Sequence, residues 1–300
     1  MANSISPLMA HAGYTDLEAY KNAKSNYIYS SKTANVGIKE KPEVKNYIKF
    51  SSTDIFTASL NAYTWDGTIY YSLDGETWVE YTDEHYSDLE NINTLYLRGL
   101  GNTKFFYLDD GEVFTPISIL NVSNVSCEGN IESLLDYEKV ANEEHPEMGE
   151  HCFWSFFSNI FNLISAPELP ATTLSMGCYE GMFVGQKSLT TPPKLPATTL
   201  AENCYNRMFY DCTSLTVLPK LPATTLVDTC YGSMFYGCTS IKLSETQTGE
   251  YQIPYRIPYS EEGADPTSGT SMQSMFRSTG GTFTDDPTVN TIYYTSNTVI

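Results

Sequence analysis

Leu169-Pro170-Ala171-Thr172-Thr173-Leu174 recurs unchanged as residues 195–200 and again as residues 221–226. Successive copies begin 26 residues apart, and nothing is inserted between them. Repetition at a fixed period of this size is typical of arrays in which each unit packs mainly on its neighbours. The second half of the chain is therefore predicted to be a solenoid of stacked units.

The rest of each unit keeps the same phase. A Cys-Tyr pair and a Met-Phe pair follow each copy, at residues 178–183, 204–209 and 230–235. In the second unit Cys204, Met208 and Cys212 recur at i, i+4 and i+8, which is the spacing of one helix face. Thr199 and Glu202 fit a capping box, and residues 215–218 alternate before a proline. Each unit is predicted as helix, turn and short strand.

The segment Phe-x-x-Cys-Thr-Ser-Leu, at residues 209–215 and with a final Ile at residues 235–241, resembles the BspA-type class of leucine-rich repeats. The Leu-Pro-Ala-Thr-Thr-Leu variety is similar to arrays in proteins of gut bacteria and their phages. Residues 69–78, 129–135 and 278–283 fit the longer pattern, so the resemblance covers about residues 67–284. Gln186, in place of Cys, and the insertion at residues 244–270 depart from it. The resemblance implies adhesion or surface display, with no shared catalytic residues.

The first half has the pattern of strands and turns. Asp74-Gly75 lies between the β-rich runs 68–72 and 77–81, which is a strong hairpin signal. Runs 93–98 and 104–108 continue this spacing and indicate a small antiparallel, immunoglobulin-like β-sandwich. The predicted fold class is α+β, mostly β: an N-terminal arm, the sandwich, and a leucine-rich-repeat solenoid of 26-residue period. The predicted domains are a docking arm (1–49), the sandwich (50–122), a linker and cap (123–151), the solenoid (152–243), and an insertion with a C-terminal cap (244–300).

Two helices are expected outside the repeats, near residues 15–23 of the arm and residues 131–140 of the linker. No apolar run is long enough for a spanning helix, so no membrane insertion is expected. The first nine residues carry no Lys or Arg before a very short apolar stretch, unlike a secretory leader. If the natural chain starts at Met1, we expect synthesis and folding in a cytoplasm; a secreted chain whose leader had been removed is the open alternative.

Charge is distributed unevenly along the chain. The formal net charge is −19, which argues against nucleic-acid binding because that requires a basic field. Residues 1–49 nevertheless hold seven Lys against four acidic residues, whereas residues 50–150 hold three basic residues against twenty acidic ones. Such asymmetry marks separate modules and makes the first 49 residues a candidate docking segment.

The seven cysteines are odd in number and contain no Cys-x-x-Cys pair. A disulfide or metal site is one interpretation of their periodicity. The preferred interpretation is that they are small apolar side chains in a narrow stacked core, because equivalent side chains on neighbouring units point the same way rather than at each other. No cofactor and no metal site are predicted.

No catalytic motif is found. The four His residues lie mostly in polar segments, without His-Glu-x-x-His, Gly-x-Ser-x-Gly or a phosphate-binding glycine loop. The acidic runs 83–90 and 109–112 lack the ligand spacing of an EF-hand and are interpreted as solvated turns rather than calcium sites. The chain is predicted not to be an enzyme.

Three tyrosines of the insertion, Tyr251, Tyr255 and Tyr259, are the candidate surface-binding residues. Tyrosine presents an apolar ring with a polar end, so these side chains could stack on sugars or fill a protein interface. Packing against the end of the solenoid is an equally weighted alternative.

Together these patterns predict a non-enzymatic phage structural protein: a capsid decoration, head fibre or tail component located in the virion and assembled in the host cytoplasm. Its expected partners are capsid or tail proteins, through the arm, and a host-surface protein or glycan. A homo-oligomer is expected by analogy with phage appendages. The alternative is a BspA-like adhesin on a bacterial cell surface. A third class, an enzyme accessory module, would require a linked catalytic domain.

Overall fold

The computed structural model describes residues 27–29, 38–40, 44–82, 89–110, 112–259, 265–266 and 269–300. The chain divides into two compact units, Met1–Val44 and Lys45–Ile300. In the first unit β1 (Tyr27–Tyr29) and β2 (Ile38–Glu40) pair in an antiparallel arrangement. The helix predicted near residues 15–23 lies outside the described residues, as does most of the predicted arm.

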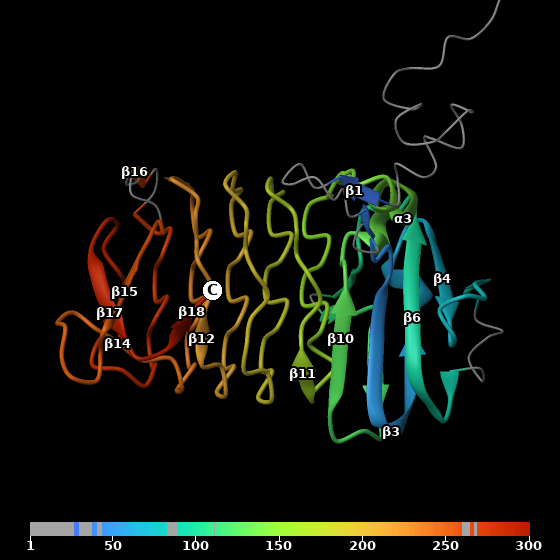
Figure 1. Cartoon of the computed structure of the whole chain (residues 1–300), viewed down its shortest axis with the longest axis horizontal. Coiled ribbons are helices and arrows are strands. Elements are labelled where there is room, and N and C mark those ends of the chain that lie inside the picture. The colour runs from blue at the N-terminus through green and yellow to red at the C-terminus, as the bar shows by residue number, and fades with distance from the viewer. Residues whose placement is uncertain are drawn as a thin grey trace, which may run out of the picture. The chain divides into compact units, whose positions relative to one another are not determined.

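A seven-stranded sheet begins the second unit (Figure 1). Its strands are, in spatial order, β11 (Leu163–Ser165), β10 (Val125–Gly129), β3 (Ile48–Leu60), β6 (Ile92–Leu100), β4 (Thr68–Ser72) and β5 (Val79–Glu80), with β9 (Ile117–Leu120) pairing the end of β3. All pairs are antiparallel except β10 with β11. The 3-10 helix η1 (Ala62–Thr64) follows β3, and the hairpin β7 (Tyr107–Asp109) and β8 (Glu112–Phe114) forms a separate ribbon.

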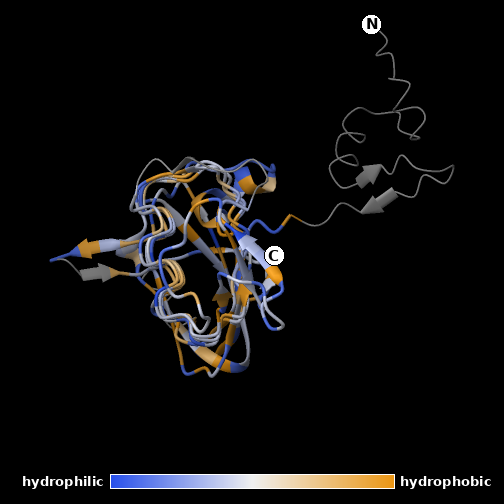
Figure 2. Ribbon diagram, turned by 90° about the vertical axis from the view of Figure 1, so that its left-hand side faces the viewer, coloured by the Kyte–Doolittle hydropathy of each residue, from blue (hydrophilic) through white to orange (hydrophobic). Residues whose placement is uncertain are grey.

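The repeated units form a stack of coils beside this sheet (Figure 1). Seen along the stack, successive coils superimpose (Figure 2). Their backbone N–H groups alternate between two kinds of partner: Tyr205 N–H donates to the carbonyl of Cys230, one coil further on, and Asn206 N–H donates back to Asn203 within its own turn. The same alternation runs from Asn203 to Cys212, so each coil is bonded to the next at every second residue.

The prediction of a helix in each unit is wrong. Residues 202–211 form consecutive turns, and a left-handed residue recurs every fourth position, at Asn203, Arg207 and Asp211. The preceding unit has Gly177, Gly181 and Gly185 at the equivalent places. Four-residue turns bury the same i, i+4 and i+8 side chains as a helix would. They differ in leaving half of the N–H groups for the next coil, whereas a helix bonds its interior N–H groups internally.

The predicted strand of each unit is also not observed as a stacked sheet. The only regular strand in residues 213–220 is β12 (Val217–Leu218), and it pairs with β18 (Thr298–Val299) from the end of the chain rather than with a neighbouring unit. The predicted helix–turn–strand solenoid is thus replaced by a stack of turn-built coils, and the predicted fold class is wrong. The protein is mostly β, and α3 (Ser133–Ala141), which is kinked at Asp136, is the one α-helix among the described residues.

The immunoglobulin-like sandwich is likewise not found. A sandwich packs two sheets face to face, whereas the inner face of the seven-stranded sheet packs on the first coil. The ring centroid of Phe50 on β3 lies 6.3 Å from that of Phe157. The rings of Phe105 and Phe153 are stacked with their centroids 5.5 Å apart. Parallel pairing of β10 with β11 joins the sheet to the coils directly. Sheet and stack therefore share one core instead of forming two modules.

Aromatic ladders fill the centre of the stack. In one ladder the centroids of successive rings lie 5.8–5.9 Å apart, from Phe153 through Tyr179 and Tyr205 to Tyr231. The other ladder runs from Phe157 through Phe183, Phe209 and Phe235 to Phe276 at 5.0–5.7 Å. All nine rings are buried. Identical residues stack because consecutive coils are related by translation along the axis.

The last part of the chain covers the far end of the stack. β14 (Leu243–Ser244), β17 (Ile292–Thr295) and β15 (Ile253–Arg256) form a three-stranded sheet there. β13 (Thr225–Leu226) pairs with β16 (Asp265–Pro266). Phe283 and Tyr293 are buried with their ring centroids 4.4 Å apart, and Phe283 lies 6.4 Å from Phe276. The apolar interior of the final coil is closed in this way.

Substitution of a glycine in a left-handed turn distinguishes turns from helices, because the free energy of unfolding changes in opposite directions in the two cases. Gly185 has φ of +72°, and a Cβ there would contact nothing within 4 Å, so Gly185→Ala changes only the backbone preference. We expect a loss of about 1 kcal/mol in the free energy of unfolding, because L-residues disfavour this region. In a helix the same change would stabilise by about 1 kcal/mol.

Urea unfolding measures this difference. Gly249→Ala is the matched control, because Gly249 is exposed, has no left-handed φ and has equal space around it. Stabilisation by Gly185→Ala would contradict the turn geometry.

Candidate functional site

The outer face of the seven-stranded sheet carries large side chains that the core does not use. On β6, Leu95 and Leu97 point into the core, so the alternation of a strand turns Tyr96 and Arg98 outward. On β4, Tyr70 is turned outward in the same way. We call this cluster the aromatic face; its members, all half-buried, are Tyr47, Lys49, Tyr70, Trp78, Tyr96, Arg98 and Tyr137.

The members of the aromatic face form one continuous row. Tyr96 lies edge-to-face with Tyr47 at 5.2 Å and with Trp78 at 6.5 Å. The Arg98 guanidinium lies 4.0 Å from the centre of the Trp78 ring and 4.1 Å from that of Tyr137. Tyr70 completes the row, 6.1 Å from Tyr137. Cation–π contacts at these distances fix the cation against the rings.

A tight turn places Trp78 beside β6. The Asp74 carboxylate accepts hydrogen bonds from the N–H groups of Thr77 and Glu76 and from the Ser72 hydroxyl. These bonds hold the pKa of Asp74 far below its usual value. Gly75, with φ of +82°, lies against the Tyr96 ring, where a Cβ would come within 3.2 Å of the ring. The turn therefore both shapes and borders the aromatic face.

The helix α3 brings Tyr137 over the sheet. It packs against β6 at Gly99, where an added Cβ would collide with the carbonyl oxygen of Leu134. Asn102 secures the same contact by donating to the Leu134 carbonyl at 3.0 Å. Because the helix approaches the strand so closely, the Tyr137 ring reaches the guanidinium of Arg98.

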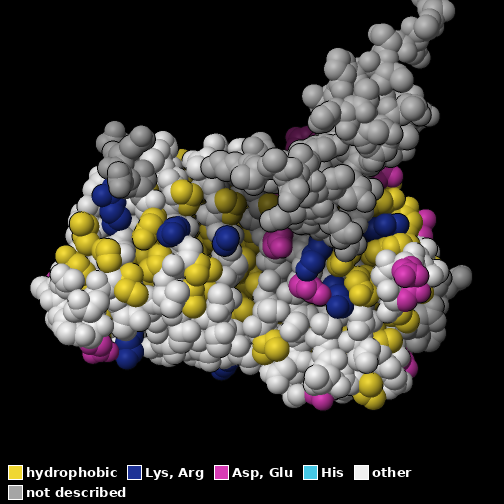
Figure 3. All heavy atoms as spheres, in the orientation of Figure 1, with side chains coloured by type: hydrophobic (Ala, Val, Ile, Leu, Met, Phe, Trp, Pro, Cys, Tyr) yellow, Lys and Arg dark blue, Asp and Glu magenta, His cyan; other side chains and the backbone are white. Residues whose placement is uncertain are grey.

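The cations on this face differ in their partners. The Nζ atoms of Lys45 and Lys49 lie 2.9 and 3.2 Å from the carboxylate oxygens of Glu128. These contacts lower the pKa of Glu128, and the hydrogen bond from Lys45 is the largest cause. Arg98 has no ion pair with any described residue, and its Nε atom is buried without an acceptor. Burial lowers the pKa of Arg98. Figure 3 shows Lys and Arg beside hydrophobic side chains over this sheet.

A second aromatic surface lies at the β7–β8 hairpin. A groove of about 380 Å³ is lined by Asn61, Tyr63, Tyr107 and Phe114. Tyr63 is 78% exposed, and Tyr107 and Phe114 contact each other at 6.0 Å. This groove carries no charged lining residue, so it offers stacking without an ionic contact.

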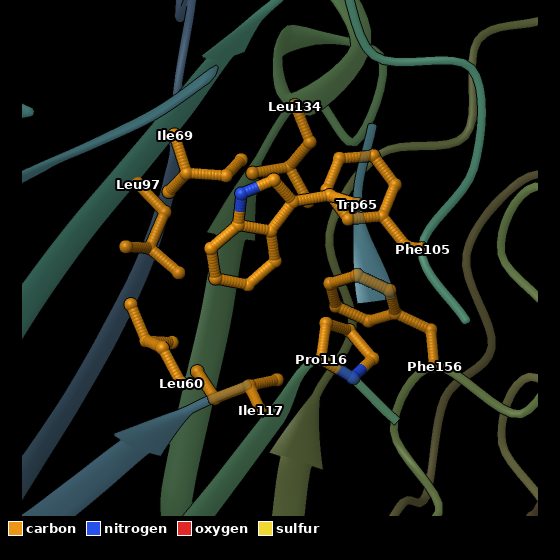
Figure 4. Close-up of a pocket in the computed structure, with 9 residues that line it drawn as sticks. All are labelled: Leu60, Trp65, Ile69, Leu97, Phe105, Pro116, Ile117, Leu134 and Phe156. Carbon is orange, nitrogen blue, oxygen red and sulfur yellow. The ribbon is translucent and has the colours of Figure 1, made fainter. Parts of the chain in front are cut away.

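A small internal cavity lies at the interface between the sheet and the first coil. Its volume is about 10 Å³, enough for about one water molecule. The lining side chains are Leu60, Trp65, Ile69, Leu97, Phe105, Pro116, Ile117, Leu134 and Phe156 (Figure 4). The cavity is a packing gap and is too small for a ligand.

The predicted binding tyrosines lie in the cap of the stack. Tyr251 and Tyr255 are buried, and the Tyr255 hydroxyl donates to the Pro219 carbonyl at 3.1 Å. Tyr259 is half-buried, 6.2 Å from Tyr255, and Lys220 lies over its ring. Packing, the alternative interpretation, describes Tyr251 and Tyr255. The three do not form an open aromatic surface.

Glu132 is a buried carboxylate that the sequence analysis did not single out. Its Oε2 lies 2.7 Å from Nδ1 of His145, while its Oε1 is buried without a hydrogen-bond partner. Burial raises the pKa of Glu132, although the bond to His145 opposes that shift. Neither side chain lines the groove or the internal cavity.

The seven cysteines are all buried free thiols. Cys212 and Cys238 donate to carbonyls of the preceding coils, those of Phe183 and Phe209, at 3.0 Å. Burial raises the pKa of both Cys212 and Cys230 to about 12. The structure contains no disulfide, and the cysteines act as small side chains of the stacked core.

Sequence reasoning missed the aromatic face. Its signal was the alternation of Leu95 and Leu97 with Tyr96 and Arg98, which assigns the aromatic and the cation to the outward side. What no local pattern gives is the approach of Trp78 and Tyr137 from a turn and a helix. The acidic run 83–90 is described only at residues 89 and 90, and Asp109 and Asp110 are exposed.

Within the described ranges, no three His, Cys, Asp or Glu side chains gather closely enough to hold a metal ion. No helix in this part of the chain is long and apolar enough to span a bilayer. Comparison with protein-family models, with curated proteins and with solved structures finds no match to this chain.

The burial of all seven thiols predicts low reactivity in the folded protein. In the native protein none of the seven cysteines should react with Ellman's reagent on the timescale of minutes, because the attacking species is the exposed thiolate. All seven should react in 6 M guanidinium chloride. Rapid native reaction would contradict their burial, and a denatured count lower by two would indicate a disulfide.

Proposed function

We propose that this chain is a non-enzymatic phage structural protein, exposed on the particle, that attaches to saccharides of a host or mucosal surface through the aromatic face. The observation that carries the attachment role is the row from Tyr96 through Trp78 to Tyr137, on the side of the sheet away from the core. The faces of sugar rings present C–H groups, which complement the electron-rich faces of aromatic rings.

The rigidity of this region supports the same role. The aromatic side chains stand on β6, on β4 and its turn, and on α3, rather than on a long loop. Gly75 and Gly99 fix the turn and the helix at close range. A binding surface held in place before its ligand arrives loses less conformational entropy on binding.

Sequence features support the placement on a phage particle. The Leu-Pro-Ala-Thr-Thr-Leu repeats resemble arrays of gut bacteria and their phages, and the first unit, with five Lys against four acidic residues, precedes a strongly acidic segment. A basic segment suits docking onto an acidic partner surface by electrostatic complementarity. A bacterial surface adhesin would use the aromatic face in the same way and differs in where the chain is found.

Substitution of Trp78 tests the attachment role. Trp78→Ala should weaken binding to the oligosaccharides that the parent retains on a glycan array by about tenfold, the equivalent of 1.4 kcal/mol. Tyr63→Ala is the matched control, because it removes an exposed aromatic side chain outside the aromatic face and should leave binding unchanged.

Circular dichroism melts establish that both variants are folded. Equal losses for the two variants would assign binding elsewhere, and absence of any saccharide bound by the parent would contradict the proposed role.

Quantitative mass spectrometry tests the location. Density-purified particles should contain the chain at a fixed stoichiometry relative to the major capsid protein, and the copy number distinguishes a capsid decoration from a tail component. Recovery only in the envelope fraction of uninfected cells would favour the adhesin. Deletion of Met1–Val44 should abolish incorporation if that unit docks the chain.

A further inference from the structure

We propose that the aromatic face selects saccharides that bear a carboxylate, and that Arg98 is the residue that pairs with this group. This inference rests on the proposed attachment function and names the chemical class of its ligand. It predicts that the acid form of a sugar binds more tightly than its neutral ester.

Arg98 has hydrogen-bonding capacity that the protein does not use. A guanidinium carries five N–H donors, and a buried donor without an acceptor is costly. No hydrogen bond or ion pair joins Arg98 to any described residue. Its Nε is buried and out of a ligand's reach, so a ligand that supplies acceptor oxygens would bond the terminal N–H groups, which the protein leaves open.

Aromatic rings hold the guanidinium of Arg98 in place. The rings of Trp78 and Tyr137 lie 4.0 and 4.1 Å from its central carbon. Aromatic rings contact the flat faces of a guanidinium and leave its N–H edge for other partners. Two parallel N–H groups on that edge match the two oxygens of a carboxylate. The same rings give the sugar a surface for stacking.

Arg98 differs from the other cations near the aromatic face in having no bound carboxylate. Lys45 and Lys49 bind Glu128, whereas Glu138 is the acidic side chain that faces Arg98 without bonding it. Glu80 lies opposite Tyr70 on the same side of the sheet, and Glu80 and Glu138 are both exposed. The pairing with a carboxylate therefore rests on the direct contact at Arg98 and not on a net positive field.

Isothermal titration calorimetry of the full chain provides the test. The probes are sialyllactose and tri-galacturonic acid, each compared with its own methyl ester, so that only the charge of the carboxyl group changes. We expect at least one acid to bind tenfold or more tightly than its ester. This comparison uses the parent protein and does not depend on any variant folding.

Arg98→Gln then tests the residue. It should reduce the preference for the acid to less than twofold and leave the affinity for the ester nearly unchanged. Arg277→Gln is the matched control, because Arg277 is an exposed arginine of the last coil away from the sheet, and this variant should keep the full preference.

The outcomes separate this inference from the proposed function. Equal affinity for acid and ester, with binding retained, overturns the carboxylate selection and leaves attachment standing. A preference that survives in Arg98→Gln, or is lost equally in Arg277→Gln, overturns the role of Arg98. No binding of either probe form, together with an empty glycan array, overturns both.

Discussion

The structure depends on how the backbone N–H groups of each coil divide their hydrogen bonds between the next coil and their own turns. Every second backbone N–H of a turn segment donates to the following coil, as Tyr205 does to Cys230, and the others close turns within their own coil. This sharing requires a left-handed residue every four positions, which Asn203, Arg207 and Asp211 supply in one unit. The register of these bonds is set within the turn segment and survives a longer connection: Tyr231 and Phe235 donate to Ser271 and Met275 of the last coil across the insertion.

The side chains of the core follow from that register. Because equivalent residues lie on top of each other, a ring that fits one coil fits the next, and Tyr179, Tyr205 and Tyr231 stack at nearly constant spacing. The same translation repeats the cysteines from coil to coil, and each remains a free thiol. Stacking places the hydroxyls of Tyr179 and Tyr231 in the interior without hydrogen-bond partners, a cost that the continuous apolar ladder offsets.

The sheet shares this core and makes the other surface available for binding. Its inner face packs on the first coil through Phe50 of β3, and Phe105, in the segment after β6, stacks on the same coil. The outward positions of β3, β4 and β6 have no packing role inside. They carry Lys49, Tyr70, Tyr96 and Arg98, and Tyr47 lies just before β3. An aromatic and cationic row on a rigid sheet suits recognition of a sugar. Because Arg98 has no hydrogen-bond acceptor in the protein, it favours a sugar that carries a carboxylate.

Local spacing in the sequence was enough to predict the repeat, its period, the buried positions and the hairpin around Asp74-Gly75. It was not enough to predict the backbone of the units, since a helix and a series of four-residue turns bury the same i and i+4 side chains. The glycines at 177, 181 and 185 carried the distinguishing signal. The tertiary structure, by contrast, places the sheet on the coils rather than on a second sheet. It alone brought Trp78 and Tyr137 to Arg98, because that contact joins a turn, a helix and a strand that are distant in the chain.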